Sequence, residues 1–164
     1  MPIASALILA NPHPEVFISD DGDNAGVIVE TPDSRRAFAI YDKRKGRFDS
    51  EVWMEQAGFD IEREKPLKLS DFAACDQRGC ATEINGEWIA ISGDRAGFED
   101  DCDRADVVIA LYPVLKFDRE SCRAALVDRR DAWAAGAHAL FITRDKVRIV
   151  SAADLRGVRP WSGG

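Results

Sequence analysis

Residues 81–94 constrain the fold more than any other part of the chain. The strand-like runs "ATEI" and "EWIAIS" are joined by Asn85-Gly86. Such a pair between two runs is a strong β-hairpin signal, because both residues tolerate the positive φ angles of a tight turn. The run "DVVIALYP" at 106–113 is continuously apolar, which is typical of a buried strand. A hairpin followed by a buried strand predicts a layered domain.

Short strands and short helices alternate in the rest of the sequence. Strand-like runs occupy 15–19, 25–30, 36–41, 123–127, 138–143 and 147–151. Helices are predicted over 49–58, 97–105 and 128–137, the first capped by Asp49 or Ser50 and stopped by Gly58, and 59–69 reads as a loop. We therefore predict an α/β domain of the α+β layered kind, with mixed β-sheets and flanking short helices.

Length and composition indicate one globular domain. The chain has 164 residues, of which 46% are hydrophobic and 31% charged, with a formal net charge of -7. The acidic balance disfavours a protein whose main task is to hold a phosphate backbone. The apolar start "MPIASALILA" is shorter than the roughly 20 residues of a membrane span. It is either a frayed element or the end of a membrane helix. We expect 1–12 to be an apolar stub or linker and 13–164 to be a single domain.

Basic residues gather in two places. Lys43, Arg44, Lys45 and Arg47 could contact nucleic-acid phosphates or form a solvated hairpin turn. Arg129 and Arg130 precede a predicted helix and could pair with Asp128 or Asp131. All six are candidate nucleic-acid contacts, and we expect any binding of single-stranded DNA to be weak.

Catalytic motifs are missing from the sequence. The histidines, His13 and His138, are far apart, whereas a dinuclear metal site needs several imidazoles. Asp94 ends a strand, where ligands often collect, but alone it is more typical of a turn or a helix N-cap. The sequence also lacks an EF-hand loop, a nucleophile elbow and a phosphate-binding loop. We predict no catalytic residue, bound metal or cofactor.

The four cysteines suggest two disulfides. Cys75 and Cys80 flank the turn-forming "DQRG", so a hairpin could bring them together. Cys102 lies in the helix before the buried strand and Cys122 just before the next strand, which would place both near one sheet edge. We expect the pairs Cys75–Cys80 and Cys102–Cys122. Four reduced, buried thiols are the alternative, and the spacings are wrong for a zinc site.

The order of the motifs resembles a known family. Gly22-Asp23, Thr31-Pro32-Asp33 and Asp42 lie in "VFISDDGDNAGVIVETPDSRRAFAIYD", Ser92-Gly93-Asp94 ends a hairpin, and "RADVVIALYP" follows. The chain ends with "AWAAGAHALFITRDKVRIVSAADLRGVRPW". Over residues 13–161 this resembles the C-terminal metallo-β-lactamase-like domain of ComEC-family DNA-uptake (competence) membrane proteins. The resemblance implies a degenerate metallo-β-lactamase-like fold.

The departures from this family are as informative as the matches. Active members carry a histidine cluster after Asp42 and a His-His-Gly-Ser after the buried strand; here the chain reads "KRKGRFDSEVWMEQAG" and "YPVLKFDRES". It is similar to the histidine-depleted, cysteine-bearing type that we associate with alphaproteobacteria. In that interpretation the relics of the metal site are Asp23, Asp42, Asp94 and His138.

The resemblance implies a non-catalytic soluble domain of a competence channel that assists uptake of transforming DNA across the inner membrane. It would face the periplasm, be monomeric when isolated, and have the membrane channel of the same polypeptide as its partner. One alternative is a nuclease that degrades one strand of incoming DNA with a metal site rebuilt from Asp23, Asp42, Asp94 and His138. The other is a structural module that docks onto the membrane part.

Overall fold

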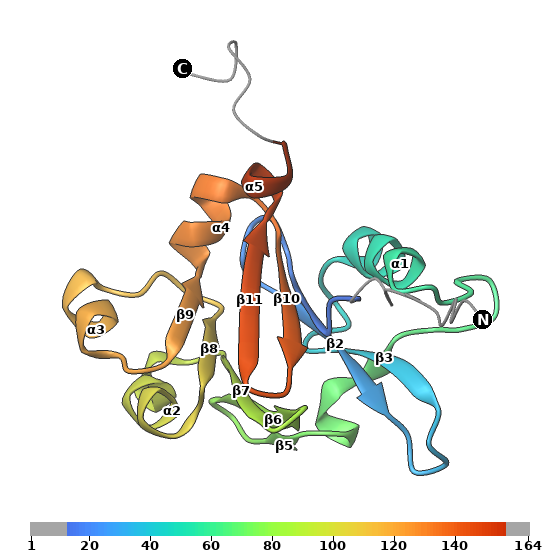
Figure 1. Cartoon of the computed structure of the whole chain (residues 1–164), viewed down its shortest axis with the longest axis horizontal. Helices are drawn as coiled ribbons and strands as arrows, with labels where there is room; N and C mark the ends of the chain where they lie inside the picture. The colour runs from blue at the N-terminus through green and yellow to red at the C-terminus, as the bar shows by residue number, and fades with distance from the viewer. Residues whose placement is uncertain (1–12, 157–164) are drawn as a thin grey trace, which may run out of the picture.

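The computed structural model describes residues 13–156 and shows an α+β fold with two mixed sheets and short helices (Figure 1). The predicted fold class is therefore confirmed. The predicted apolar stub, residues 1–12, and the terminal Arg-Pro-Trp lie outside the described residues. Within 13–156, no helix combines the length and apolar character needed to cross a bilayer.

The first sheet has six strands and joins the two ends of the described chain. Its order is β11 (Lys146–Ser151), β10 (His138–Thr143), β1 (Val16–Ile18), β2 (Ala25–Glu30), β3 (Arg36–Ile40) and β4 (Leu67–Lys68). Neighbours are antiparallel except β3 and β4. Because β1 pairs with both β2 and β10, the N-terminal and C-terminal hairpins share one sheet.

The second sheet has five strands and carries the predicted hairpin. Its order is β5 (Ala74–Cys75), β6 (Gly79–Ile84), β7 (Glu87–Ser92), β8 (Val107–Ala110) and β9 (Ala125–Asp128). The β6–β7 turn is at Asn85 and Gly86, with φ angles of 52° and 89°, as an Asn-Gly turn requires. Strands β7, β8 and β9 run parallel, so their carboxyl ends share one edge.

Helices cover the outer faces of both sheets (Figure 1). They are α1 (Arg47–Gln56), α2 (Phe98–Arg104), α3 (Lys116–Ser121), α4 (Arg129–Ala135) and α5 (Ala152–Arg156), with 3-10 turns η1 (Leu69–Asp71) and η2 (Arg95–Gly97). Against the first sheet, α1 packs Trp53 and Met54 on Phe17, Phe38 and Ile40. Against the second, α2 packs Phe98 and Cys102 on Ala90 and Val108.

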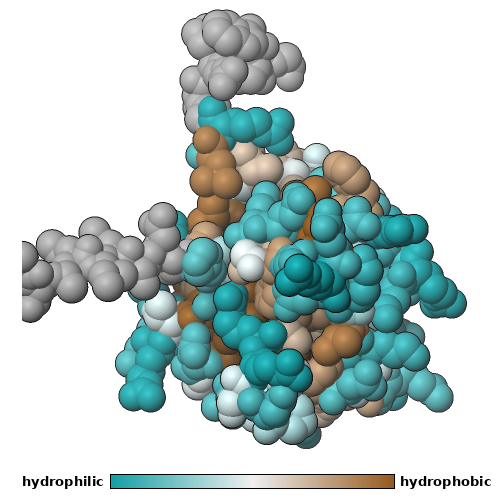
Figure 2. All heavy atoms as spheres, turned by 90° about the vertical axis from the view of Figure 1, so that its right-hand side faces the viewer, coloured by the Kyte–Doolittle hydropathy of each residue, from teal (hydrophilic) through white to brown (hydrophobic). Residues whose placement is uncertain are grey.

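The main core lies between the two sheets. It contains buried aliphatic residues from both, among them Val16, Val27, Ile89, Ile109 and Leu140. The contacts of α1 with the first sheet and of α2 with the second sheet lie on the opposite faces of those sheets. The layers therefore follow the order helix, sheet, sheet, helix. Figure 2 shows the face on the α1 side, which is mostly hydrophilic with smaller separate hydrophobic areas.

Helix α1 begins earlier than predicted. We expected Asp49 or Ser50 to cap it, but the N-cap is Gly46, whose φ of 61° is left-handed, with no side-chain cap. Glycine adopts this conformation without the steric cost that a Cβ brings, so the helix starts at Arg47 and includes the last basic residue of the predicted turn. The short elements α3, β4 and β5 also had no predicted counterpart.

Both predicted disulfides are present in the structure. Cys75 and Cys80 are direct cross-strand partners in β5 and β6, with Cα atoms 4.0 Å apart. This is shorter than the usual range of about 4.4–6.8 Å for disulfides and than the roughly 4.5–5.5 Å between facing residues of an antiparallel pair. Cys102 in α2 joins Cys122 just after α3, with Cα atoms 5.1 Å apart. No cysteine is free.

Candidate strand-end site and basic surface

The carboxyl ends of β7, β8 and β9 bring Ser92, Ala110 and Asp128 into register at one sheet edge. The chain continues from β7 to Asp94 and from β8 to Tyr112. The first sheet meets this edge through Tyr41, because a Cβ added to Gly93 would lie 2.2 Å from the Tyr41 hydroxyl oxygen. The predicted relic residue Asp94 lies just beyond this edge.

Asp94 caps a turn. Its Oδ1 accepts a hydrogen bond of 2.8 Å from the Ala96 backbone N–H, which makes it the N-cap of η2. A carboxylate satisfies an otherwise unpaired helix-end donor in this way. The structure thus gives Asp94 the cap role that its position after a strand also suggested.

Ser92 and Tyr112 form a hydroxyl pair beneath this turn. Ser92 is completely buried, and its Oγ lies 2.9 Å from the Tyr112 hydroxyl. Burial raises the pKa of Tyr112, so the phenol stays neutral at physiological pH. The Arg95 guanidinium carbon lies 5.7 Å from the centre of the Tyr112 ring. These contacts fix the strand end by packing and hydrogen bonding.

A buried ion-pair network occupies the end of β9. The Asp128 side chain is 0% exposed, and its Oδ1 lies 3.2 Å from Nη1 of Arg119 on α3. Asp128 also accepts hydrogen bonds from the backbone N–H groups of Val114 and Asp131. Arg119 Nη2 donates to both Asp131 oxygens, at 2.9 and 2.7 Å. The network joins α3, β9 and α4.

The pKa values of Asp131 and Arg119 each shift in the direction that favours the charged form of the side chain. Partial burial acts to raise the pKa of Asp131, but the Asp128 backbone N–H and the Arg119 guanidinium outweigh it and lower that pKa. Burial acts to lower the pKa of Arg119, and the two carboxylates outweigh it and raise that pKa. Both shifts favour the ion pair between the Asp131 carboxylate and the Arg119 guanidinium.

Asn24 organises the other two aspartates of the predicted relic. It is buried, and its Nδ2 donates to the backbone oxygens of Asp42 and Lys45 while its Oδ1 accepts from the backbone N–H of Asp42. Asp23 forms an ion pair of 3.1 Å with Lys45. Asp42 pairs with Arg44 at 3.3 Å, and the Arg44 backbone and side-chain N–H groups lower the Asp42 pKa.

His138 lies at the start of β10, where Nδ1 is 2.8 Å from the Gly136 backbone oxygen. It is 8% exposed and opposite Ser151 in the β10–β11 register. Each of the four predicted relic residues thus has its own local contact. Among residues 13–156, no three or more His, Cys, Asp or Glu side chains form a group that could hold a metal ion.

One residue of each predicted basic group contacts the same turn. Lys45 pairs with Asp23, and Arg129 Nε donates a 3.0 Å hydrogen bond to the Asp21 backbone oxygen. Gly22, between these two contacts, has a φ of 68° and packs so closely on α4 that an added Cβ would lie 2.8 Å from the Arg129 Cα. The β1–β2 turn, residues 20–24, therefore brings together cations far apart in sequence.

Exposed aromatic side chains accompany both basic groups. Phe48, in the first turn of α1 beside Arg47, is 76% exposed. Trp133 on α4 is 59% exposed, and the Arg129 guanidinium carbon lies 5.5 Å from its ring centre. We call these two aromatic residues and the six basic residues Lys43, Arg44, Lys45, Arg47, Arg129 and Arg130 the basic–aromatic surface.

Several of these residues had no predicted role. Trp133 is four residues after Arg129, so helical spacing already placed its ring beside a cation. Phe48 directly follows Arg47, but consecutive residues do not face each other on a helix, so only its place after the basic run pointed to it. Asn24 follows an Asp-rich turn, but its partners are 18 and 21 residues away. Arg119 lies in an unpredicted helix, and no local pattern indicates its pairing with Asp128.

Comparison with known proteins finds no matching family model, no matching curated protein and no matching solved structure.

Proposed function

We propose that this chain is a non-catalytic domain of a ComEC-like competence protein that contacts single-stranded DNA during uptake across the inner membrane. The observation that carries the proposal is the basic–aromatic surface. One residue of each basic group, Lys45 and Arg129, contacts the β1–β2 turn. Exposed Phe48 follows the first group in sequence, and exposed Trp133 lies beside Arg129. Grooves that bind single strands combine cations for the phosphates with rings on which unpaired bases stack.

The ion pairs of this surface leave its cations available to phosphates. Arg44 and Arg47 have side chains 91% and 93% exposed, and their partners are Asp42 and Glu51. Exposed ion pairs of this kind contribute about 0–1 kcal/mol, so exchanging a carboxylate partner for a phosphate costs little. The net charge of -7 opposes approach of DNA. We therefore expect micromolar or weaker affinity at low salt.

The fold supports the family assignment within this proposal. Two sheets lie between helical layers, Ser92-Gly93-Asp94 ends a strand at the edge of the second sheet, and Asp42 follows a strand of the first. Both sheets meet there through Tyr41 and Gly93. The degenerate metallo-β-lactamase-like assignment places a metal site at such an edge, and here Asp94 is a cap and Asp128 pairs with Arg119.

The disulfides support a periplasmic location for the domain. Both bonds are formed in the folded chain, Cys75–Cys80 between two strands and Cys102–Cys122 from α2 to the residue after α3, and disulfides persist in oxidising compartments. In this proposal the domain belongs to an inner-membrane protein, is monomeric when isolated, and has the channel part of the same polypeptide as its partner.

Fluorescence anisotropy with a labelled single strand of about 20 nucleotides tests the proposal. We expect Phe48→Ala and Trp133→Ala each to weaken binding by about fivefold, because a base stacked on an aromatic ring contributes about 1–3 kcal/mol. Arg130→Ala, at an exposed position, should weaken binding and flatten its salt dependence.

Phe117→Ala is the matched control, since Phe117 is 79% exposed but lies on α3. It should leave the affinity unchanged. If Phe117→Ala weakens binding as much as Phe48→Ala and Trp133→Ala do, or if neither of those variants has an effect, the basic–aromatic surface is not the DNA contact.

A further inference from the structure

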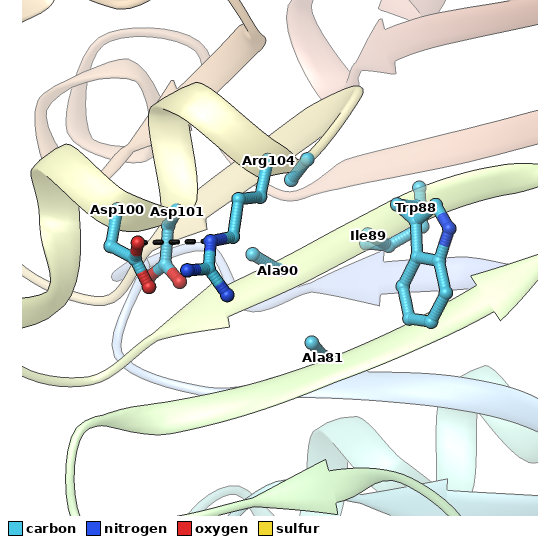
Figure 3. Close-up of a pocket in the computed structure, with 8 residues that line it drawn as sticks. Ala81, Trp88, Ile89, Ala90, Asp100, Asp101 and Arg104 are labelled. Carbon is cyan, nitrogen blue, oxygen red and sulfur yellow. Dashed lines mark ion pairs between the residues drawn. The ribbon is translucent and has the colours of Figure 1, made fainter.

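A pocket of about 440 Å³ lies on the outer face of the second sheet, beside α2 (Figure 3). Ala81 and Ala90, a cross-strand pair of β6 and β7, form its floor. Trp88, two residues from Ala90 and hence on the same face, stands at one end and is 47% exposed. Helix α2 contributes Asp100, Asp101 and Arg104 at the other end. The pocket is thus apolar in its floor, aromatic at one end and acidic at the other.

The two acids in the pocket differ in their partners. Arg104 Nε forms an ion pair with Asp100 Oδ1 at 3.0 Å, drawn in Figure 3. Among residues 13–156, no Lys, Arg or His nitrogen lies within 4.0 Å of the Asp101 carboxylate. Asp101 is half-buried, and burial together with the negative charges of Asp100 and Asp76 raises its pKa, against the opposing effect of the Ser92 hydroxyl. A cation in the pocket would offset this unfavourable environment.

A second hollow continues from the first. It has a volume of about 280 Å³, shares Ala81, Asp100 and Asp101 with the pocket, and extends to Asp76 beside the β5–β6 hairpin. The two together form a groove along the sheet, longer than a single side chain needs. The charged side chains of the groove are the acids Asp76, Asp100 and Asp101 and the cations Arg78 and Arg104. The acids exceed the cations by one, so a cationic partner would complement the groove.

We propose that this groove binds an extended peptide segment through an arginine or lysine side chain. The cationic group pairs with Asp101, the aliphatic stem lies over Ala81 and Ala90, and a neighbouring residue of the peptide packs on Trp88. Long basic side chains combine an apolar stem with a charged end in this way. The groove shares no residue with the basic–aromatic surface. The groove would take a cationic ligand, whereas the basic–aromatic surface would take an anionic one.

A titration followed by NMR of isotope-labelled protein tests this. The probe is the peptide acetyl-Gly-Ala-Arg-Ala-Gly-amide, and its matched control replaces arginine with citrulline, which keeps the shape and removes the charge. We expect the arginine peptide to shift the Trp88 indole N–H and the Ala90 amide signals, with the citrulline peptide binding about tenfold more weakly.

Two protein variants locate the site. Asp101→Asn should weaken binding about tenfold, whereas Asp103→Asn, an equal charge change on the exposed part of α2, should stay within about twofold. Ala81→Leu fills the floor without changing charge and should abolish the shifts. Equal binding of both peptides, equal losses in Asp101→Asn and Asp103→Asn, or unperturbed Trp88 and Ala90 signals would each overturn the proposal.

Discussion

Replacing Arg119 should destabilise the domain far more than replacing an arginine in an exposed ion pair. In Arg119→Ala, Asp128 keeps its two backbone donors but loses its only guanidinium contact, and Asp131 loses two hydrogen bonds. Hydrogen bonds to charged groups contribute about 1.5–3 kcal/mol each. The Arg119 side chain is 38% exposed, so water replaces part of this loss. We expect a net cost of about 2 kcal/mol.

Thermal unfolding with the disulfides intact measures this effect. A cost of about 2 kcal/mol corresponds to a Tm drop of about 4–8 °C for a domain of this size. Arg104→Ala is the control, because the side chains of Arg104 and Asp100 are 79% and 65% exposed and such a pair contributes about 0.5 kcal/mol. Equal Tm changes in the two variants would refute the view that the Arg119 network, because Asp128 is buried, contributes more to stability than the exposed Arg104–Asp100 pair.

The same comparison has a predicted pH dependence. The pKa of Asp131 is held below its ordinary value of 3.8 in the folded protein, so the stability that it contributes is complete above that value. It is lost as the pH falls through the lower folded-state pKa. The Tm difference between wild type and Arg119→Ala should therefore narrow below about pH 3.8. A difference that widens on acidification would contradict the assigned charges.

Other predictions concern the turn, the sheet edge, the cysteines and the N-terminus. Asn24→Ala should cost about 3 kcal/mol in urea unfolding, because four backbone groups lose a hydrogen bond to its side chain; a cost below 1 kcal/mol would mean that water replaces the side chain. Gly79→Ala should lower the Tm by several degrees, since its Cβ would lie 2.1 Å from the Ile91 backbone oxygen; an unchanged Tm would show that β6 shifts freely. Denatured protein alkylated without reductant should carry no label by intact mass, and four labels would refute both disulfides. Deleting residues 1–10 should leave the Tm nearly unchanged, and a drop of many degrees would make that segment part of the core.

Local signals predicted the elements whose causes are local. The β6–β7 hairpin follows from Asn85-Gly86, and α4 lies within the predicted helix 128–137, where the structure adds a cap at Asp128 and an end at Gly136, whose φ is 82°. The β10–β11 hairpin also lies where the apolar runs placed it. In each case the residues that set the structure are neighbours in sequence.

What the sequence did not predict depends on distant contacts. The N-cap of α1, Gly46, directly follows the loop Asp42–Lys45, and Asn24 donates hydrogen bonds to the backbone oxygens at both ends of that loop. Strands β4 and β5 have two residues each, too few for a periodic pattern, and exist because a longer strand pairs with them. The division of the strands into two sheets, and the meeting of Arg129 with the β1–β2 turn, likewise arise only in the folded chain.

Equilibrium binding of a single strand and of a duplex of the same sequence, measured side by side over a salt series in buffer with manganese, tests the central claim most directly. The proposed non-catalytic role predicts weak, salt-sensitive binding that favours the single strand, because only unpaired bases can stack on Phe48 and Trp133, and it predicts that the strand is recovered intact. Equal or tighter binding of the duplex, no binding of either, or a shortened strand would contradict it.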